Sequence, residues 1–338
     1  MPRHFLRDDD LSPAEQSAVL DLAARMKSDR YTLRPLAGPR AVAVLFDKPS
    51  LRTRLSFDVG IAELGGHPIV VDTQVTHFGR GVAGRRGPGA VPVRLRDRAA
   101  HLRRRPDRRA GRGRDGAGGE RADRRLPPCQ LLADLLTVRE HCGGTTGRTL
   151  AYLGDAANNM AHSYLVGGAT AGMHVRVAGP AGHDPDPAVV ARAAEIAAST
   201  GGSVRVLRDP AEAVAGADVV ATDTWTSMGQ EGDGRDRITA FQPYQVNKTM
   251  LAGAAPQVVV LHCLPAHRGE EITDEVLDGI RSVVFDQAEN RLHAQKALLA
   301  WLLDRHAEEL AAAGEQAARP AGEPSAASVI ASVVGESA

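Results

Sequence analysis

The chain has 338 residues, which is enough for two domains of ordinary size. Its 41 Lys and Arg residues balance 41 Asp and Glu residues, so the overall charge gives no reason to expect a nucleic-acid or membrane partner. The three cysteines follow neither a metal-ligand spacing nor a disulfide framework, which suits a reducing cytoplasm. No signal-peptide core begins the chain, and no run approaches the ~20 apolar residues of a membrane span.

The most informative local pattern is a strand that runs into a polar turn and then a helix. Ala41–Phe46 is an apolar run typical of a buried strand, and the spacing of Leu55, Val59 and Leu64 predicts a helix. Ser50-Leu51-Arg52-Thr53-Arg54 lies between them. Free N–H groups at a helix start favour an anion, and guanidiniums bind phosphate through paired donors. We therefore predict an anion site; the alternative is a capped helix with surface arginines.

Strands and helices alternate along most of the remaining chain. Such alternation predicts an α/β fold of parallel sheets with helices on both faces, in which ligands bind at the carboxyl ends of strands. The tail after Gly314 is rich in Ala, Ser, Glu and Pro, which predicts a poorly ordered extension. The expected strands are 68–72, 149–153, 174–177, 204–207, 218–221, 258–261 and 282–285, and the expected helices are 129–140, 159–171, 187–200 and 290–312.

Four polar clusters follow expected strands or begin expected helices. The segment 154–160 has two adjacent amides, which can bind a ligand carboxylate or carbonyl or simply cap a helix. The segment 222–229, Thr-Asp-Thr-Trp-Thr-Ser-Met-Gly, offers a carboxylate for an ammonium group. His262-Cys263-Leu264-Pro265 ends a strand, with a buried thiol beside a turn as the alternative reading. Arg291 follows the last expected strand and is a surface residue unless a site lies beside it.

Together these motifs resemble the aspartate/ornithine carbamoyltransferase family over residues 1–81 and 128–306. Residues 50–54 resemble its carbamoyl-phosphate loop, S-T-R-T-R. Residues 223–229 match D-x-W-x-S-M-G and residues 262–265 match H-C-L-P, and these two motifs favour the branch that uses ornithine as acceptor. The resemblance implies a carbamoyl-phosphate-binding domain over 1–140, an ornithine-binding domain over 141–290, a helix over 291–313 packing back on the first domain, and a disordered tail over 314–338.

The resemblance also implies a reaction and its residues. The neutral δ-amine of L-ornithine attacks the carbamoyl carbon and phosphate leaves, with no metal or organic cofactor. A cytoplasmic homotrimer in arginine biosynthesis is implied, in which His77 reaches a neighbouring subunit's phosphate. The implied carbamoyl-phosphate contacts are Ser50, Leu51, Arg52, Thr53, Arg54, His77, Gln130, Cys263, Leu264 and Arg291; the implied ornithine contacts are Asn159, Asp223, Ser227 and Met228; and the expected catalytic residues are Arg52, Thr53, Asp223 and Cys263.

Residues 82–127 depart from the family pattern. Within 82–125 there are 15 Arg and 5 acidic residues, a net charge of +10, and too few large apolar residues to offset the entropy of ordering. The family's R-T-F-G motif is absent, and its H-P-C-Q motif reads Pro127-Pro128-Cys129-Gln130. One alternative is an arginine-rich arm for RNA or another polyanion. Another is an inactive pseudo-enzyme that has lost the His and Arg donors.

A frame shift between two compensating indels is our hypothesis for this segment. Read one base later with permitted codons, residues 101–128 can spell T-F-G-D-D-R-I-A-E-L-A-G-A-A-T-V-P-V-V-N-A-L-T-D-G-F-H-P, and 93–100 can spell Y-V-S-A-I-V-L-R. We predict that sequencing the coding DNA will find R-T-F-G and F-H-P in that alternative frame. Their absence from the alternative frame would disprove the hypothesis.

Overall fold

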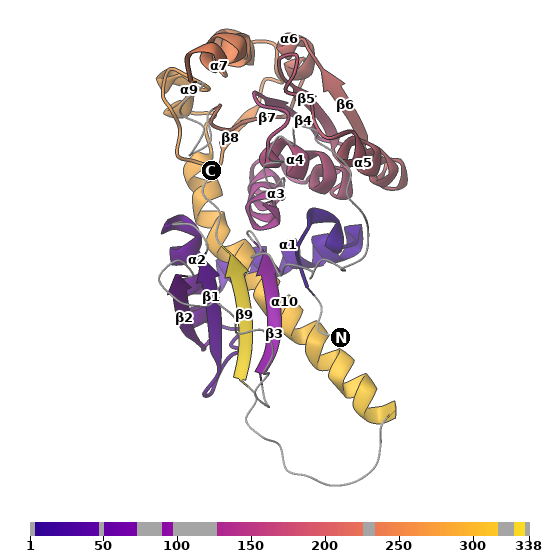
Figure 1. Ribbon diagram of the computed structural model, residues 1–338, viewed down its shortest axis with the longest axis vertical. Helices are drawn as coiled ribbons and strands as arrows, with labels where there is room; N and C mark the ends of the chain where they lie inside the picture. The colour runs from indigo at the N-terminus through magenta and orange to yellow at the C-terminus, as the bar shows by residue number, and fades with distance from the viewer. Residues whose placement is uncertain are drawn as a thin grey trace, which may run out of the picture.

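The protein is an assembly of parallel sheets and covering helices, seen in a computed structural model that describes residues 4–46, 51–72, 90–96, 127–225, 234–316 and 328–334 (Figure 1). The predicted α/β class is confirmed, because the paired strands in each sheet run parallel. Among these residues no helix combines the length and the apolar character needed to cross a bilayer.

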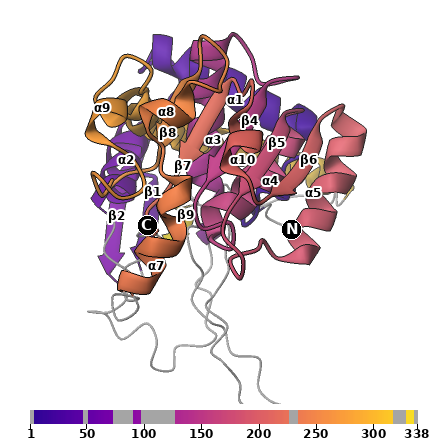
Figure 2. The same ribbon diagram turned by 90° about the horizontal axis from the view of Figure 1, so that it is seen from above.

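The larger sheet has the strand order β6-β5-β4-β7-β8 (Figure 2). Its central strands are buried almost throughout, as parallel strands covered on both faces must be. The order reverses between β4 and β7, and ligands bind at such a switch point, beyond the carboxyl ends of the strands. The strands are β4 (Thr149–Leu153), β5 (His174–Ala178), β6 (Ser203–Leu207), β7 (Val219–Thr222) and β8 (Val259–His262).

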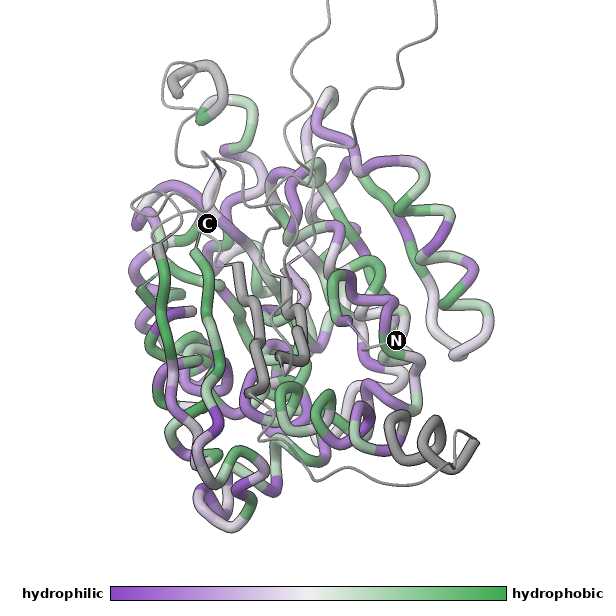
Figure 3. The backbone as a smooth tube through the Cα atoms, turned by 60° about the horizontal axis from the view of Figure 1, so that its bottom comes forward, coloured by the Kyte–Doolittle hydropathy of each residue, from purple (hydrophilic) through white to green (hydrophobic). Residues whose placement is uncertain are grey.

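Helices cover this sheet and supply its connections. Asn158 caps α4 by accepting a hydrogen bond from the N–H of Ala161, and Asp186 caps α5 by accepting one from the N–H of Ala188. Figure 3 colours the backbone by hydropathy, and hydrophobic stretches alternate with hydrophilic ones along it. The helices are α4 (Asn159–Thr170), α5 (Pro187–Thr200), α6 (Pro210–Val214), α7 (Gly234–Phe241), α8 (Lys248–Leu251) and α9 (Asp274–Leu277), with a 3-10 turn, η4, at Gln242–Tyr244.

The N-terminal region is built on smaller parallel pairs. Strand β1 (Ala41–Phe46) pairs with β2 (His67–Asp72), and helix α2 (Leu51–Glu63) connects them. Strand β3 (Ala90–Arg96) pairs with β9 (Ser328–Val334), which lies beside β1 (Figure 1). Before them come η1 (Asp8–Asp10) and α1 (Pro13–Ser28), which begins with a capping box between Ser12 and Glu15.

Two helices join these halves. Helix α3 (Pro128–Cys142) packs against α1, α4 and α10, and α10 (Val284–Gln316) packs along α1, α2 and α3 (Figure 1). Every residue of α3 from Pro128 to Val138 is buried, polar ones included. Because α10 starts beside β8 and then crosses to α2, it carries side chains from one half into the other.

The structure differs from the sequence prediction in three places. A strand was predicted over 282–285, but α10 begins at Val284, and Ser282 makes only an isolated bridge to Val260. The predicted disordered tail contains strand β9, whose run of Val and Ile favours a strand once a partner is available. Strand β3 likewise lies within 82–127, where composition predicted too little burial for ordered structure.

Lys296 is a buried cation that ties α10 to α2. Its Nζ donates to Glu63 Oε2 at 2.7 Å and to the carbonyl of Arg30 at 2.8 Å, and its side chain is 1% exposed. The Arg30 guanidinium lies 2.5 Å from the other Glu63 oxygen. Burial alone would raise the pKa of Glu63, but the Lys296 and Arg30 hydrogen bonds outweigh it and lower that pKa.

We predict that Lys296→Met lowers the free energy of unfolding at pH 7 by about 3 kcal/mol, because it leaves Glu63 buried without its main partner. A depressed folded-state pKa contributes stability that is lost as pH falls through that pKa, so the difference from the unaltered chain should shrink toward pH 3. Urea unfolding at both pH values measures it. Lys248→Met, at an exposed pair with Glu275, is the control and should lower the free energy of unfolding far less, because solvent screens an exposed pair. Equal losses at the two positions would contradict the prediction.

Candidate active site

The predicted anion-binding turn is the first turn of helix α2. The helix begins at Leu51, so Arg52 and Thr53 sit where backbone N–H groups have no partner within the helix. Thr53 is buried and Arg52 half-buried, whereas Leu51 and Arg54 are exposed. Arg54 lies 3.8 Å from Asp58, an i,i+4 pair on the helix surface. The described part of the turn therefore directs Arg52 and Thr53 inward.

Arg291 meets this turn from α10. Its guanidinium donates to Thr53 Oγ1 at 2.5 Å and to the side-chain carbonyl of Gln130 on α3. All three residues are buried, with Arg291 7% exposed. The sequence left open whether Arg291 is a surface residue, and its burial against Thr53 answers that question. Three helices thus bring a cation, a hydroxyl and an amide together.

A second cluster lies at the carboxyl ends of β7 and β8. The Cys263 thiol donates to Asp223 Oδ1 at 3.1 Å, and the Thr224 N–H donates to the same oxygen at 2.7 Å. Asn158 approaches the other Asp223 oxygen at 3.5 Å. Burial raises the pKa of Asp223, although the hydrogen bonds from Cys263 and from the Thr224 N–H oppose the rise. Burial and the Asp223 carboxylate together raise the pKa of Cys263 well above its usual value.

The two clusters are joined through Leu264. The Arg52 guanidinium donates to the Leu264 carbonyl, in the residue that follows Cys263. Burial and the nearby Arg291 charge lower the pKa of Arg52, while Cys263 and Asp223 act in the opposite direction. The cationic cluster from α2 and α10 therefore borders the thiol–carboxylate pair from the sheet.

A buried His–Glu pair fixes the backbone of this junction. The Leu264 N–H donates to His262 Nδ1 at 2.9 Å, so the ring proton lies on Nε2, which donates to Glu271 at 2.9 Å. Leu264 adopts a positive φ of 55°, an unusual conformation for a non-glycine residue. The His262 contact stabilises that turn and thereby aims the Leu264 carbonyl at Arg52.

One group among the described residues has the composition of a metal site. His267, Glu270 and Glu271 each offer a ligand atom within 4.8 Å of the others. Glu271 Oε1, however, already accepts hydrogen bonds from His262 and from the His267 N–H, at 2.9 and 2.6 Å. Its contacts assign it to positioning the 262–264 turn.

Gly154 shows how closely the sheet edge is packed beside Asp223. It ends β4 with a φ of 130°, and a Cβ there would lie 3.4 Å from the Trp225 ring. Trp225 is itself buried and stacks on Phe241. The motif tryptophan is therefore a packing residue beneath the site.

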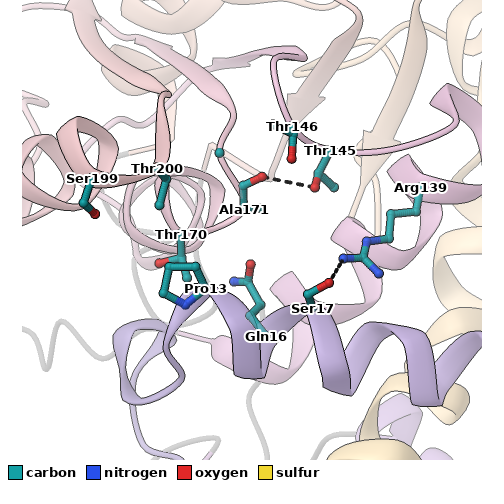
Figure 4. A pocket seen from close by; sticks show the side chains of 11 residues that line it. Pro13, Gln16, Ser17, Arg139, Thr145, Thr146, Thr170, Ala171, Ser199 and Thr200 are labelled. Atoms are coloured by element: carbon teal, nitrogen blue, oxygen red, sulfur yellow. Dashed lines mark hydrogen bonds between the residues drawn. The ribbon is translucent and has the colours of Figure 1, made fainter.

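A separate cavity of about 230 Å³ lies between α1 and the larger sheet (Figure 4). Gln16 projects from α1 toward it, and Thr145, before β4, and Thr170, at the end of α4, also line it. Most of the remaining lining residues precede β4, β5 or β6, at the amino ends of these strands. The two clusters described above lie at the opposite, carboxyl edge, so this cavity is distinct from the candidate active site.

The structure thus brings together seven of the predicted site residues: Arg52, Thr53, Gln130, Asp223, Cys263, Leu264 and Arg291. Asn159 begins α4, and its neighbour Asn158 contacts Asp223. Leu51 and Arg54 lie at the exposed side of α2. The predictions for Ser50, His77, Ser227 and Met228 fall outside the described residues.

Two family models match the chain, one on each side of residues 87–145. The carbamoyl-P binding domain of aspartate/ornithine carbamoyltransferase matches residues 3–86, and the Asp/Orn binding domain of that family matches residues 146–302. The chain belongs to the aspartate/ornithine carbamoyltransferase family. Arg52 and Thr53 lie in the first matched range, and Asp223, Cys263 and Arg291 in the second.

Family members of known name resemble this chain over most of its length. Ornithine carbamoyltransferase from Mycobacterium ulcerans is 55% identical over 317 residues, covering 90% of this chain and 99% of that protein. The Clavibacter michiganensis enzyme of the same name is 56% identical over 308 residues, with 90% and 99% covered. The structure of ornithine carbamoyltransferase from Pyrococcus furiosus superimposes with a TM-score of 0.74 at 36% identity, covering 90% of this chain and 97% of that one.

Sequence reasoning missed several residues that support the family's site. Asp134, Tyr164, Glu271 and Gln287 are buried and bonded to site residues or to one another. The sequence did offer a signal for Asp134, because this residue stands among leucines in a helix predicted to be buried. An acidic side chain in such a place needs hydrogen-bond partners. Partners contributed by other helices are not visible in a local pattern.

The Asp223–Cys263 contact makes a prediction about thiol reactivity. Asp223→Asn removes a charge that raises the pKa of Cys263, so more thiolate forms at pH 8 and alkylation accelerates by about three- to tenfold. Iodoacetamide labelling followed by mass spectrometry measures it, with half-buried Cys142 in the same chain as the reference. The pH at which labelling levels off should also fall. An unchanged Cys263-to-Cys142 ratio across the pH range would contradict this electrostatic account.

Proposed function

We propose that the protein catalyses transfer of a carbamoyl group from carbamoyl phosphate to L-ornithine, giving L-citrulline and phosphate. The observation that carries the proposal is the junction itself. Arg52 links an anion-binding helix start to the backbone beside the Asp223–Cys263 pair. A transferase needs both substrates at one place, and this contact sets the two clusters side by side.

On the carbamoyl-phosphate side, the helix start and the guanidiniums bind the phosphate. Arg52 and Arg291 supply fork-shaped donors, and the free N–H groups of α2 add to them. Gln130 offers a carbonyl oxygen that can accept from the carbamoyl amino group. Ser50, Arg54 and a neighbouring subunit's His77 complete this half in our proposal, with residues 1–140 as its domain.

On the acceptor side, a buried carboxylate favours a cationic ligand over an anionic one. Asp223 is 5% exposed and would repel the second carboxylate of aspartate, whereas ornithine brings an amine. We assign Asn159, Ser227 and Met228 to the same half, within a domain over 141–290. The ornithine nitrogen forms the new C–N bond, the tetrahedral intermediate expels phosphate, and overall the released proton is taken up by that phosphate.

The protein does this work by positioning and by charge stabilisation. The guanidiniums stabilise the leaving phosphate, and fixed geometry converts a bimolecular encounter into a local step. The assembly we propose is a homotrimer in the cytoplasm that acts in arginine biosynthesis, so that each site is completed by its neighbour.

The direct test is citrulline formation by the purified chain from carbamoyl phosphate and ornithine, with aspartate as the competing acceptor. We expect product with ornithine and little with aspartate. A version carrying the alternative reading frame over 82–127 should be faster, because it regains the two missing motifs. Absence of citrulline from both versions would overturn the proposed function, and absence from the unaltered chain alone would make that chain an inactive relative.

Arg52→Gln should lower kcat/KM for carbamoyl phosphate by about 10²–10³, since it removes a charged donor that acts where negative charge develops. Steady-state kinetics with ornithine held at saturation measures the loss. Arg205→Gln is the matched control, because Arg205 lies on the edge strand β6, where its exposed guanidinium pairs with Glu212 of α6. Equal rates for Arg52→Gln and Arg205→Gln would remove Arg52 from the site.

A further inference from the structure

A buried carboxylate lies directly behind the candidate site. Asp134, on α3, is 1% exposed and accepts three hydrogen bonds, each of 2.7 Å. Gln130 Nε2 and Gln287 Nε2 both donate to Oδ1, and the Tyr164 hydroxyl donates to Oδ2. The three donors come from α3, α10 and α4. One side chain therefore gathers three of the helices that surround the site.

An ionised carboxylate can only accept, and this fixes which way each glutamine amide faces. Because the NH₂ group of Gln130 points at Asp134, its oxygen must point the other way. That oxygen meets Arg291, on the site's side of the helix. Without Asp134 only Arg291 would hold the amide in this orientation, since a rotated amide would present NH₂ to a guanidinium that can only donate.

Gln287 extends the same arrangement to the sheet. With its NH₂ group on Asp134, its oxygen accepts a 2.9 Å hydrogen bond from the backbone N–H of His262, at the end of β8. His262 in turn holds the Leu264 N–H. The carboxylate is thus two hydrogen bonds from the backbone of the Cys263 turn and one from Gln130.

Burial raises the pKa of Asp134, and the Tyr164, Gln130 and Gln287 hydrogen bonds and the Arg291 charge oppose the rise. Three donors converge on this one side chain, which is the environment expected for a charged acceptor. A carboxyl group that only filled space in the core would cost free energy that a leucine would not. Two of its donors, Gln130 and Gln287, use their side-chain oxygens to contact Arg291 and the His262 N–H.

We propose that Asp134 is a positioning residue that orients the Gln130 carbonyl toward the carbamoyl group and couples that contact, through Gln287, to the turn carrying Cys263. This inference rests on the proposed function for the identity of its ligand. It assigns to Asp134 a role exerted through Gln130 and Gln287, without contact to substrate.

The test is a double-mutant cycle on carbamoyl-phosphate binding, read by isothermal titration calorimetry on the full chain. Asp134→Ala should weaken binding about tenfold, the worth of one well-oriented hydrogen bond. In a Gln130→Ala background the same change should weaken it less than twofold, because the group being oriented is gone. Equal effects of Asp134→Ala in both backgrounds would overturn the inference.

Two further variants separate positioning from general stability. Thr137→Val removes a buried hydrogen bond from Asn290 between the same two helices, one turn further along, and should lower the melting temperature without changing binding. Asp134→Asn can keep an oxygen toward both glutamines, because its NH₂ group can face Tyr164, whose hydroxyl then accepts. It should restore affinity to within about threefold of the unaltered chain. A binding loss in Thr137→Val as large as in Asp134→Ala would overturn the proposal.

If Asp134→Ala does not fold, Gln130→Glu tests the same contact from its other side. Two carboxylates at this distance share a proton at low pH and repel each other once it is lost. The Arg291 guanidinium faces the side chain of residue 130, and the Tyr164 hydroxyl faces Asp134. The affinity of this variant relative to the unaltered chain should fall by at least about tenfold from pH 6 to pH 8. A pH-independent ratio would overturn the inference.

These outcomes are separable from those of the proposed function. Carbamoyl-phosphate binding that follows the cycle, without citrulline formation, would support the role of Asp134 and overturn the transferase activity. An unaltered chain that does not bind carbamoyl phosphate at all would overturn the inference itself.

Discussion

The site depends on holding two guanidiniums, Arg52 and Arg291, close together inside the protein. Their mutual repulsion, added to burial, lowers the pKa of Arg52, so the arrangement carries an electrostatic cost. Neutral oxygens offset part of it: the Leu264 carbonyl on one cation, and Thr53 and Gln130 on the other. A phosphate dianion would offset far more, because it replaces dipoles with charge at the same distance. This imbalance is the physical basis of the phosphate-binding role that we propose for this half of the site.

Strands and helices, which are rigid, bring these charged side chains together. The strand order of the larger sheet reverses beside Asp223, and β8 delivers Cys263 next to it. Helix α10 begins at the same edge and crosses to α2, where Lys296 holds it against Glu63. Arg291 lies on α10 between these two anchor points. Contacts at both ends of this stretch of α10 therefore fix the position of the Arg291 guanidinium.

Much of this was predictable from the chain itself, for a physical reason. Apolar strands followed by polar motifs mark the carboxyl edge of a parallel sheet, so the 223–225 and 262–265 motifs could be placed together before any coordinates were known. Local patterns could not show the Asp134 contacts with Tyr164 and Gln287, which lie 30 and 153 residues away on other helices. The same holds for the hydrogen bond that joins Gln287 to the His262 backbone 25 residues away, and Glu271 meets the His262 ring only because the chain turns between them. The start of α10 was misjudged because Val283 and Val284 suit a strand by propensity, whereas packing against α3 continues the helix.

The boundary at residue 127 is where the sequence and the structure bear on each other most directly. From Pro128 onward every residue of α3 to Val138 is buried, and its polar members have matched partners from other helices. Just upstream, residues 82–125 carry a net charge of +10. At Pro127 the backbone still serves the helix start, since its carbonyl accepts from the N–H groups of Gln130 and Leu131. Only the side chain differs in capacity, because a pyrrolidine ring cannot donate a hydrogen bond as the histidine of an H-P-C-Q motif could. Gradual divergence would erode the buried contacts on both sides of such a point, whereas a change of reading frame alters one side completely and leaves the other intact.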